Sequence, residues 1–351
     1  MSLGELRIEN LRCIESAALE FSSELNLVSG ENGAGKTSIL EAIFLLGRGR
    51  SFRTRTTERL IRHGQDALTV FGRTQDLPPT AAGIEVAKEG TRARINGENV
   101  QTLLQLSGVL PVQAIDPDIH KLIEHGPERR RRWLDWLVFH VEPTFAAQWT
   151  RYQRALKQRN AALKAGMPDV TNWDVVLVEA GEAISKARES ALRRLTPYLE
   201  RLFAAFSGLA VQIGLQAGWS ADRTLQEQLR ANLERDRERG LTHSGPHRAD
   251  VDLRIKGRVA REVLSRGQQK LTAVAMIVSQ LQLLRAELGV QATLLLDDPA
   301  AELDPKNLRR LFDELRSLEC QMIATSLTPE TALFQAPKAT FHVEQGRVIR
   351  V

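Results

Sequence analysis

The sequence is poor in cysteine and contains no long apolar run. Cys13 and Cys320 are the only cysteines among 351 residues, and neither belongs to a CxxC pair or a Cys/His cluster. A zinc site is therefore not supported, and we expect two buried thiols in a reducing cytoplasm. No stretch of about 18 apolar residues predicts a membrane span. The start, MSLGELRIEN, lacks the basic and then apolar leader of a secreted protein.

The composition is that of an ordinary globular protein. Hydrophobic residues make up 42% and charged residues 26%, and no internal repeat or low-complexity tract appears, so we expect a packed core. The length suggests about two domains. The net charge is +5 and comes mostly from arginine. The abundance of arginine says little about partners by itself, whereas its clustering says more.

A glycine-rich loop follows the apolar run LNLVS. The stretch GENGAGKT matches G-x-x-x-x-G-K-[ST], and it follows an expected strand and opens an expected helix. The alternative, an ordinary glycine turn, does not explain that context. Glycines let several backbone N–H groups point at one phosphate, while Lys36 reaches the terminal phosphates and Thr37 offers a hydroxyl to Mg²⁺. The residues predicted to bind ATP here are Gly30, Glu31, Asn32, Gly33, Ala34, Gly35, Lys36, Thr37 and Ser38.

A pair of acids ends a second apolar strand. In TLLLDD, Asp297 is the expected Mg²⁺ partner, and Asp298 is placed to orient or deprotonate an attacking water. Taken alone, the pair would indicate two solvated acids in a turn. Together with the phosphate loop, it predicts the metal side of a site for ATP hydrolysis.

A third motif, LSRGQQK, stands at the start of an expected helix. Ser265, Gly267 and Gln268 could form a second anion-binding helix terminus, or Ser265 could be a plain N-cap. Gln113, in VQAIDP, is expected at the end of a strand. Asp304 follows the acid pair in AELDP.

The order of elements predicts an α/β head interrupted by helices. Strands are expected near the start, around residues 67–95 and 108–115, and again in the last third. Residues 128–207 carry helical apolar stripes that predict a hairpin of two long antiparallel helices. We therefore expect an ATP-binding head made of residues 1–127 and 208–351, and a helical arm at 128–207.

The ordered set of motifs resembles an ABC-type ATPase head of the kind found in Rad50 and SMC proteins. The stretches GRGRSFRT, EHGPERRRRWLDW, RYQRALKQRNAALK, SGPHRAD and LSRGQQK narrow the resemblance to the RecF family over essentially the whole chain. The resemblance assigns Ser265, Gly267 and Gln268 to the signature loop that binds ATP. It assigns Gln113 to the Q-loop, with a role in catalysis and at the metal, and Asp304 to the D-loop.

The RecF resemblance also implies a function. It implies ATP-driven dimerisation, weak DNA-dependent ATP hydrolysis with Lys36 and Asp298 as catalytic residues, and a nucleotide contact from Arg12. It further implies recognition of duplex DNA and of gapped or junction DNA, and assistance to RecA loading with RecO and RecR in DNA repair, recombination, replication-fork maintenance and the SOS response. Two rival functions stay open: an SMC-like DNA tether, and the motor subunit of a transporter.

The chain departs from the general ABC pattern at two places. Asp298 stands where most ABC enzymes carry glutamate, so we expect slow turnover. Where many heads carry a switch histidine, this chain has Thr325 and Ser326, either of which could contact the γ-phosphate. His247 is either a functional or a buried structural histidine.

An arginine run follows the phosphate-loop helix. Arg48, Arg50, Arg53 and Arg55 are predicted to contact duplex DNA, because the run is interleaved with hydroxyl side chains suited to phosphate oxygens and carries no base-reading element. The alternative is a solvated basic face. A second candidate surface is the arm, with Arg151, Arg154, Lys157 and Arg159.

Overall fold

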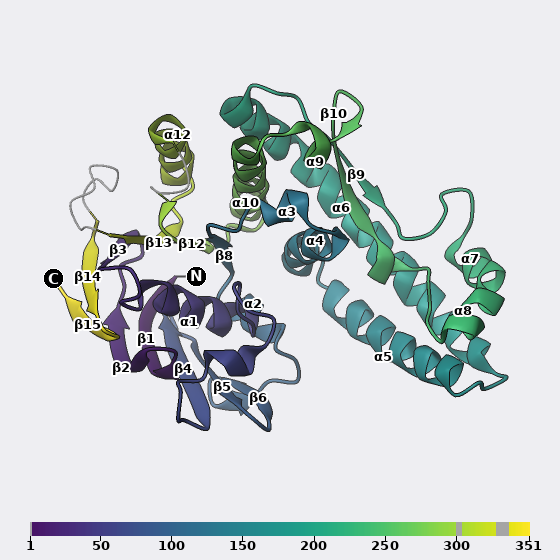
Figure 1. The fold of residues 1–351 in the computed structure, drawn as a ribbon, viewed down its shortest axis with the longest axis horizontal. Helices are drawn as coiled ribbons and strands as arrows, with labels where there is room; N and C mark the ends of the chain where they lie inside the picture. Colours follow the sequence, from purple (N-terminus) through teal and green to yellow (C-terminus); the bar gives the residue numbers. More distant parts are fainter. Residues whose placement is uncertain (1, 300–303, 328–336) are drawn as a thin grey trace. The chain divides into compact units, whose positions relative to one another are not determined.

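The computed structural model describes residues 2–299, 304–327 and 337–351. The chain forms two compact units (Figure 1). The first comprises the residues up to Ile119 together with those from Leu284 onward, and the second comprises His120–Leu283. The first unit is built from both ends of the chain, as predicted. The boundaries differ from the prediction, because residues 208–283 pack with the helices rather than with the head.

One sheet of the first unit is antiparallel, in the order β2-β1-β4-β5-β6-β7. The buried positions of β4 alternate with less buried ones, as expected for a sheet with one face on the core. The turn between β5 and β6 lies at Lys88 and Glu89, as predicted. The strands are β1 (Leu3–Leu11), β2 (Ile14–Glu20), β4 (Ala67–Thr74), β5 (Ala81–Ala87), β6 (Gly90–Ile95) and β7 (Glu98–Asn99).

The other sheet of this unit is parallel except for its last hairpin, in the order β15-β14-β3-β13-β12-β8. All four residues of β12 are buried, which explains its unbroken apolar sequence. The carboxyl ends of parallel strands share one edge, so the loops after β3 and β12 meet there. The strands are β3 (Leu25–Ser29), β8 (Val112–Ile115), β12 (Thr293–Leu296), β13 (Gln321–Ser326), β14 (Ala339–Glu344) and β15 (Arg347–Arg350).

Helix α1 (Lys36–Arg48) contacts both sheets and is almost entirely buried. Its apolar side chains join those of both sheets in one core cluster. At Gly47 a Cβ would lie 2.5 Å from the carbonyl oxygen of Leu110, so only glycine permits this close approach. Residues 108 and 109, at the start of the strand expected at 108–115, instead end a short helix. The smaller helices of this unit are η1 (Thr57–Leu60), α2 (Gln105–Val109) and α12 (Pro305–Arg316).

The second unit is mainly helical. Helices α5 (Phe145–Lys164) and α6 (Asp174–Ser207) pack against each other as the predicted hairpin. Pro127 stands in the first turn of α4 (Pro127–Val141), as predicted. The remaining helices are α3 (Lys121–Glu124), η2 (Val170–Trp173), α7 (Leu225–Ala231), α8 (Leu233–Arg239), η3 (Pro246–Arg248), α9 (Ala260–Val263) and α10 (Arg266–Leu288).

A separate three-stranded sheet explains why the head does not include residues 208–259. Strands β9 (Gln212–Gln216), β10 (Asp250–Ile255) and β11 (Arg258–Val259) pair only with one another among the described strands. Their alternation indicates strands correctly, but it does not indicate which sheet they join. The predicted domain boundary was wrong for that reason.

Helix α10 is held to α4 by two hydrogen bonds to one residue. The indole Nε1 of Trp133 donates to the Met276 carbonyl at 3.1 Å, and the amide of Gln280 donates to the Trp133 carbonyl at 2.7 Å. By length and composition α10 is apolar enough to cross a membrane, but 72% of its most apolar window is buried in the protein. A buried core helix passes the same test, so this is weak support for a span.

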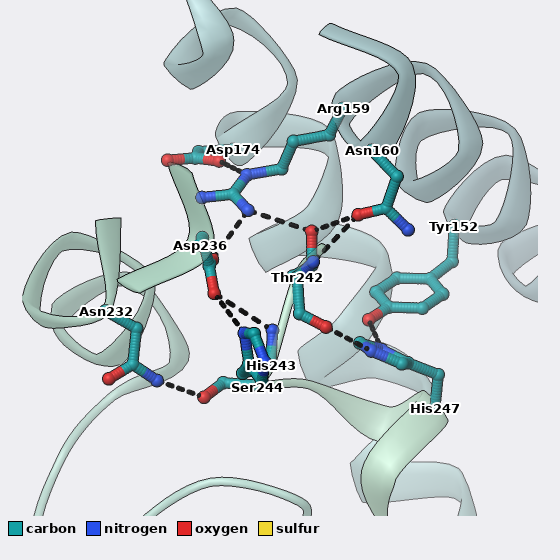
Figure 2. A network of polar contacts seen from close by, with 10 residues as sticks. All are labelled: Tyr152, Arg159, Asn160, Asp174, Asn232, Asp236, Thr242, His243, Ser244 and His247. Atoms are coloured by element: carbon teal, nitrogen blue, oxygen red, sulfur yellow. Dashed lines mark hydrogen bonds and ion pairs between the residues drawn. The ribbon is translucent and has the colours of Figure 1, made fainter. Parts of the chain in front are cut away.

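A buried polar network ties the segment after α6 to the helical hairpin (Figure 2). Arg159 of α5 is fully buried and donates to Asp174 at 2.7 Å and to Asp236 at 2.8 Å. The same guanidinium donates to the hydroxyl of Thr242 at 2.8 Å. Arg159 is therefore a structural residue, and its expected place on an arm surface for DNA was wrong.

Candidate nucleotide-binding site

A cavity of about 500 Å³ in the first unit brings the phosphate loop and the acid pair together. Its walls come from the loop after β3, the end of β12, the β1–β2 turn and the loop after α1. The lining residues are Arg12, Cys13, Glu31, Asn32, Gly33, Gly35, Lys36, Thr37, Ser38, Arg53, Pro117, Asp297, Asp298 and Thr325.

Two glycines of the loop are required by its geometry. Gly30 has a φ of 151°, and a Cβ there would collide with the Val343 carbonyl oxygen. Gly35 has a φ of 120° and caps α1 without a side-chain acceptor. The N-terminus of α1 therefore opens at the cavity wall with its positive dipole end, which suits an anion such as a phosphate.

Lys36 is held on the loop itself. Its ammonium donates to the carbonyl oxygens of Gly30 at 2.5 Å and Glu31 at 2.9 Å. Burial lowers the pKa of Lys36, and the charges of Asp298 and Asp297 partly oppose that shift. The Lys36 ammonium thus contacts the loop carbonyls and feels the charges of the acid pair, and in this place it could bind a phosphate in the cavity.

Thr37 and Asp297 are 260 positions apart in sequence and in direct contact. The Thr37 hydroxyl donates to the two carboxylate oxygens of Asp297 at 2.9 and 3.2 Å. A hydroxyl and a carboxylate are hard oxygen donors of the kind that Mg²⁺ prefers. The two residues therefore fit a shared magnesium site beside the helix terminus.

Thr325 organises both acids. Its hydroxyl donates to Asp297 Oδ1 at 3.0 Å and accepts the backbone N–H of Asp298 at 2.8 Å. Asp298 has a φ of 47°, a left-handed conformation that is uncommon outside glycine, and its side chain lines the cavity. Both candidates for the switch position are buried residues of β13, and of the two Thr325 lines the cavity.

The β1–β2 turn supplies Arg12 and Cys13. The Arg12 guanidinium donates to the carboxylate of Glu41 at 2.5 and 3.0 Å. Cys13 is exposed at the cavity, which corrects the expectation of two buried thiols, while Cys320 is buried as expected. Burial raises the pKa of Cys320 to about 12.

Gln113 does not end its strand. It is the second residue of β8, pairs in register with Leu294 and is 6% exposed. Asp297 lies three residues beyond Leu294, or roughly 10 Å along the strand. Among the described residues that line the cavity, the loop after β8 contributes Pro117, and Gln113 is not one of them. The predicted place of Gln113 was wrong, and its role at the metal stays a prediction without support from this geometry.

The arginines of the predicted DNA run differ in environment. Arg48 is half-buried, stacks its guanidinium over Phe44 at 5.4 Å and donates to the Val112 carbonyl at 3.3 Å. Burial lowers the pKa of Arg48 well below its usual range. Arg53 lines the nucleotide cavity. Arg50 is half-buried and Arg55 is exposed, and their predicted DNA contacts stay predictions.

The signature residues lie in the second unit at the start of α10. Gln268 N–H donates to the Ser265 hydroxyl at 3.4 Å, and Ser265 N–H donates to the Gln268 side chain at 3.0 Å. This reciprocal pair is a capping box. Ser265 and Gly267 are exposed, and a Cβ at Gly267 would meet nothing within 4 Å. The fold of the chain therefore does not itself require glycine at 267.

Two further residues named from the sequence act as structural partners. Asp304 caps α12 by accepting the backbone N–H groups of Lys306 and Asn307, and these hydrogen bonds lower its pKa. His247 accepts the Tyr152 hydroxyl at Nδ1 (2.7 Å) and donates from Nε2 to the Thr242 carbonyl at 3.1 Å (Figure 2). Burial lowers the pKa of His247 to about 4. The histidine is neutral and both its nitrogens are used, which favours the structural alternative.

Glu41 was not named from the sequence, and Thr325 was named only as a possible contact of the γ-phosphate, not as the partner of both acids. Glu41 is an acid on a helix that is otherwise almost wholly apolar, SILEAIFLLG, one turn after Thr37. That isolated charge was the available signal, since a buried carboxylate requires a partner.

The whole chain is similar to one group of proteins. Residues 2–348 match the family model of the RecF/RecN/SMC N terminal domain. The chain is 40% identical to the DNA replication and repair protein RecF of Cellvibrio japonicus, over 99% of each chain. It is 38% identical to the protein of that name from Coxiella burnetii, over 99% of this chain and 98% of the other.

Solved structures give the same result. A structure of the recombination mediator protein RecF with ATP, in the RecFOR pathway, has a TM-score of 0.91 and 26% identity, and the match covers 100% of this chain and 97% of that one. An Smc head bound to the C-winged helix domain of ScpA has a TM-score of 0.59 and 17% identity, covering 100% and 98%. That second likeness shows the fold alone.

Proposed function

The chain belongs to the RecF family of ABC-type ATPases, and from this premise we propose that it is an ATP-dependent DNA-binding protein of recombinational repair and replication-fork maintenance. The observation that carries the proposal is the meeting of Lys36, Thr37, Asp297 and Asp298 at one cavity. The solved structure of a RecF protein with ATP supports ATP as the nucleotide. The place of action is the cytoplasm.

The described residues divide the work of ATP hydrolysis. The N-terminus of α1 and the ammonium of Lys36 bind the phosphates, for which Lys36 exchanges its loop carbonyls for phosphate oxygens. Thr37 and Asp297 would hold Mg²⁺, which when bound neutralises charge on the terminal phosphates. Asp298 orients a water molecule and accepts its proton as the water oxygen attacks the γ-phosphorus, whose bond to the bridging oxygen breaks so that ADP leaves. Because the side chain of Asp298 is shorter than that of glutamate, we expect weak hydrolysis. From the family we expect DNA to stimulate it.

ATP would also join two copies of the chain. Each chain carries one phosphate loop and one signature loop, so each ATP would lie between Lys36 of one protomer and Ser265 of the other. The open space around Gly267 supports close approach of a second surface. Ser265→Arg should block the dimer and leave ATP binding by the monomer intact. Dimerisation of this variant at the wild-type ATP concentration would contradict the arrangement.

The DNA partners follow from the family. We propose binding to duplex DNA and to gapped or junction DNA, and assistance to RecA loading together with RecO and RecR. The name of the similar structure, a recombination mediator of the RecFOR pathway, supports this role. Arg50 and Arg55 are the proposed phosphate contacts in the run after α1.

ATP hydrolysis and sedimentation, each with and without gapped DNA and ATP, test the proposal. We expect a monomer without ATP, a dimer with ATP, Mg²⁺ and DNA, and hydrolysis that rises when DNA is added. A dimer that closes on DNA without stimulated turnover would favour the SMC-like tether instead. A protein that stays monomeric and inactive under all conditions would refute the proposal.

A further inference from the structure

Glu41 is a fully buried acid behind two of the side chains that line the nucleotide cavity, Arg12 and Arg53. It lies in α1 and is 0% exposed. Its carboxylate accepts two hydrogen bonds from Arg12 and one from the Ser51 hydroxyl at 2.7 Å, and Arg53 Nη1 lies 3.9 Å away. A buried carboxylate is stable only when such partners compensate its lost hydration.

The two arginines that line the cavity, among the described residues, are both partners of this one carboxylate. The side chain of Arg12 is 31% exposed and that of Arg53 is 52% exposed, so each has one side on Glu41 and another toward the cavity. The phosphates of a bound nucleotide would compete with Glu41 for both cations. The carboxylate therefore sets where both guanidinium groups lie before the nucleotide arrives.

Ser51 extends this arrangement into the arginine run. It is 6% exposed, so its hydroxyl is not a DNA contact. The hydroxyl donates to Glu41 and accepts the backbone N–H groups of Arg53 and Thr54 at 3.0 and 3.1 Å. The loop after α1 is thus folded onto the same carboxylate that holds Arg12.

The far end of that loop is fixed to the same turn. The backbone N–H of Arg12 donates to the Leu60 carbonyl, and that of Arg62 donates to the Asn10 carbonyl, both at 2.8 Å. Residues 49–62 therefore form a strap that is attached to the nucleotide side of the site at both ends. A movement of Arg12 or Arg53 toward a phosphate would therefore alter the hydrogen bonds that hold the strap in place.

We propose that Glu41 is a positioning residue that couples ATP in the cavity to the arginines of this strap. The proposal rests on the function proposed above and specifies its regulation. ATP and duplex DNA bind cooperatively because the nucleotide competes for Arg12 and Arg53, which Glu41 holds, while the strap that carries Arg50 and Arg55 is folded onto the same carboxylate through Ser51. By linkage, the factor by which DNA tightens ATP binding equals the factor by which ATP tightens DNA binding.

The measurement is the dissociation constant of a non-hydrolysable ATP analogue with and without duplex DNA, at one salt concentration. We expect a ratio of about 10 for the wild type, within the usual range of coupling between two sites. Glu41→Gln keeps the size of the side chain but removes its charge, so the ratio should fall to about 1. Glu41→Asp, which keeps the charge, should recover part of the coupling.

Ser51→Ala separates the contact of Glu41 with Arg12 from the contact of Glu41 with the strap. It leaves the bond between Glu41 and Arg12 in place and removes the link to the backbone of the strap. Affinity for the analogue without DNA should fall less than in Glu41→Gln, because Arg12 keeps its carboxylate partner, while the ratio falls to about 1. This variant decides the question even if Glu41→Gln does not fold.

Asp135→Asn is the matched control. Asp135 holds Arg188 in the second unit by a pair of hydrogen bonds of 2.7 and 3.0 Å, similar to the pair between Glu41 and Arg12. Its loss should lower stability and leave the coupling ratio unchanged. A fall in the ratio for this variant too would mean that Glu41 acts only through stability.

The outcomes separate this inference from the proposed function. A wild-type protein that binds neither the analogue nor DNA would refute both. A wild type that binds both with a ratio of 1 would refute the coupling alone. A wild-type ratio near 10 that persists in Glu41→Gln and in Ser51→Ala would show that the coupling runs through other residues.

Discussion

Replacing Thr325 with valine removes one hydroxyl and little else. The two side chains have the same branched shape, and Thr325 is 1% exposed. The change deletes the donor to Asp297 at 3.0 Å and the acceptor for the Asp298 N–H at 2.8 Å. An unsatisfied buried N–H costs about 1–3 kcal/mol, so we expect stability to fall by about 2 kcal/mol.

The effect on hydrolysis should exceed the effect on binding. The bond from Asp298 N–H helps to hold that residue in its left-handed conformation, which costs about 1–3 kcal/mol outside glycine. Without the acceptor, Asp298 can relax and move its carboxylate. A displacement of about 1 Å in a catalytic group can lower a rate about 100-fold. Lys36 and the helix terminus are untouched, so affinity for ATP should change little.

Steady-state hydrolysis with DNA, nucleotide binding and urea unfolding together test this reasoning. Thr325→Ser is the matched control, because it keeps the hydroxyl and loses only the methyl group, and its rate should stay near that of the wild type. A valine variant that is destabilised but hydrolyses ATP at the wild-type rate would refute the positioning role.

Four further outcomes are expected. Lys36→Met should weaken ATP binding by at least about 10-fold in a folded protein, measured by titration. Asp298→Asn should bind ATP and dimerise but stall hydrolysis, and a normal rate would assign the base elsewhere. Changing Arg50 and Arg55 together to alanine should lower the log–log salt slope of DNA binding by about 1.8, with ATP binding unchanged; an unchanged slope would place the DNA surface elsewhere. His247 is neutral in the folded chain with a pKa of about 4, so its unfolded form takes up the proton first, and stability should fall by roughly 3 kcal/mol as the pH drops from 6.5 to 4. Urea unfolding of His247→Gln should lack that dependence.

The sequence was sufficient where the chemistry is local. The motif at residues 30–38 correctly predicted a phosphate-type loop followed by a helix, because glycines at this spacing after a strand are compatible with few other local structures. Thr37 and Asp297 were both predicted to bind Mg²⁺; the structure brings the two side chains into contact, since parallel strands place their carboxyl ends at one edge, and the metal itself stays a prediction. The contact between these two residues, 260 positions apart, follows from that rule.

Prediction failed where the answer depends on neighbours. Gln113 looked like a strand-end residue, but the strand begins only at Val112 and ends at Ile115. Residues 108 and 109, predicted to start that strand, belong to the helix at 105–109 instead. The alternation of apolar and polar residues in 212–216 and 250–255 indicated strands correctly. The pattern within a strand does not indicate which sheet the strand joins, so the domain boundary was misplaced.

The charge of Arg159 suggested an exposed residue, whereas its helical spacing from apolar residues indicates a buried one. Its neighbours Arg151, Arg154 and Lys157 are exposed, and a cation among them suggests a surface. Yet Arg159 follows Tyr152 and Leu156 at intervals of seven and three, and those spacings keep all three on the buried face of α5.

The network around Arg159 then follows from burial. A guanidinium on that face must meet carboxylates, and Asp174 and Asp236 supply them. Asp236 comes from α8, beyond the predicted end of the arm. The helical period therefore indicates that Arg159 is buried and needs acidic partners, but it does not indicate which elements supply them. Asp174 comes from within the predicted arm and Asp236 from beyond it.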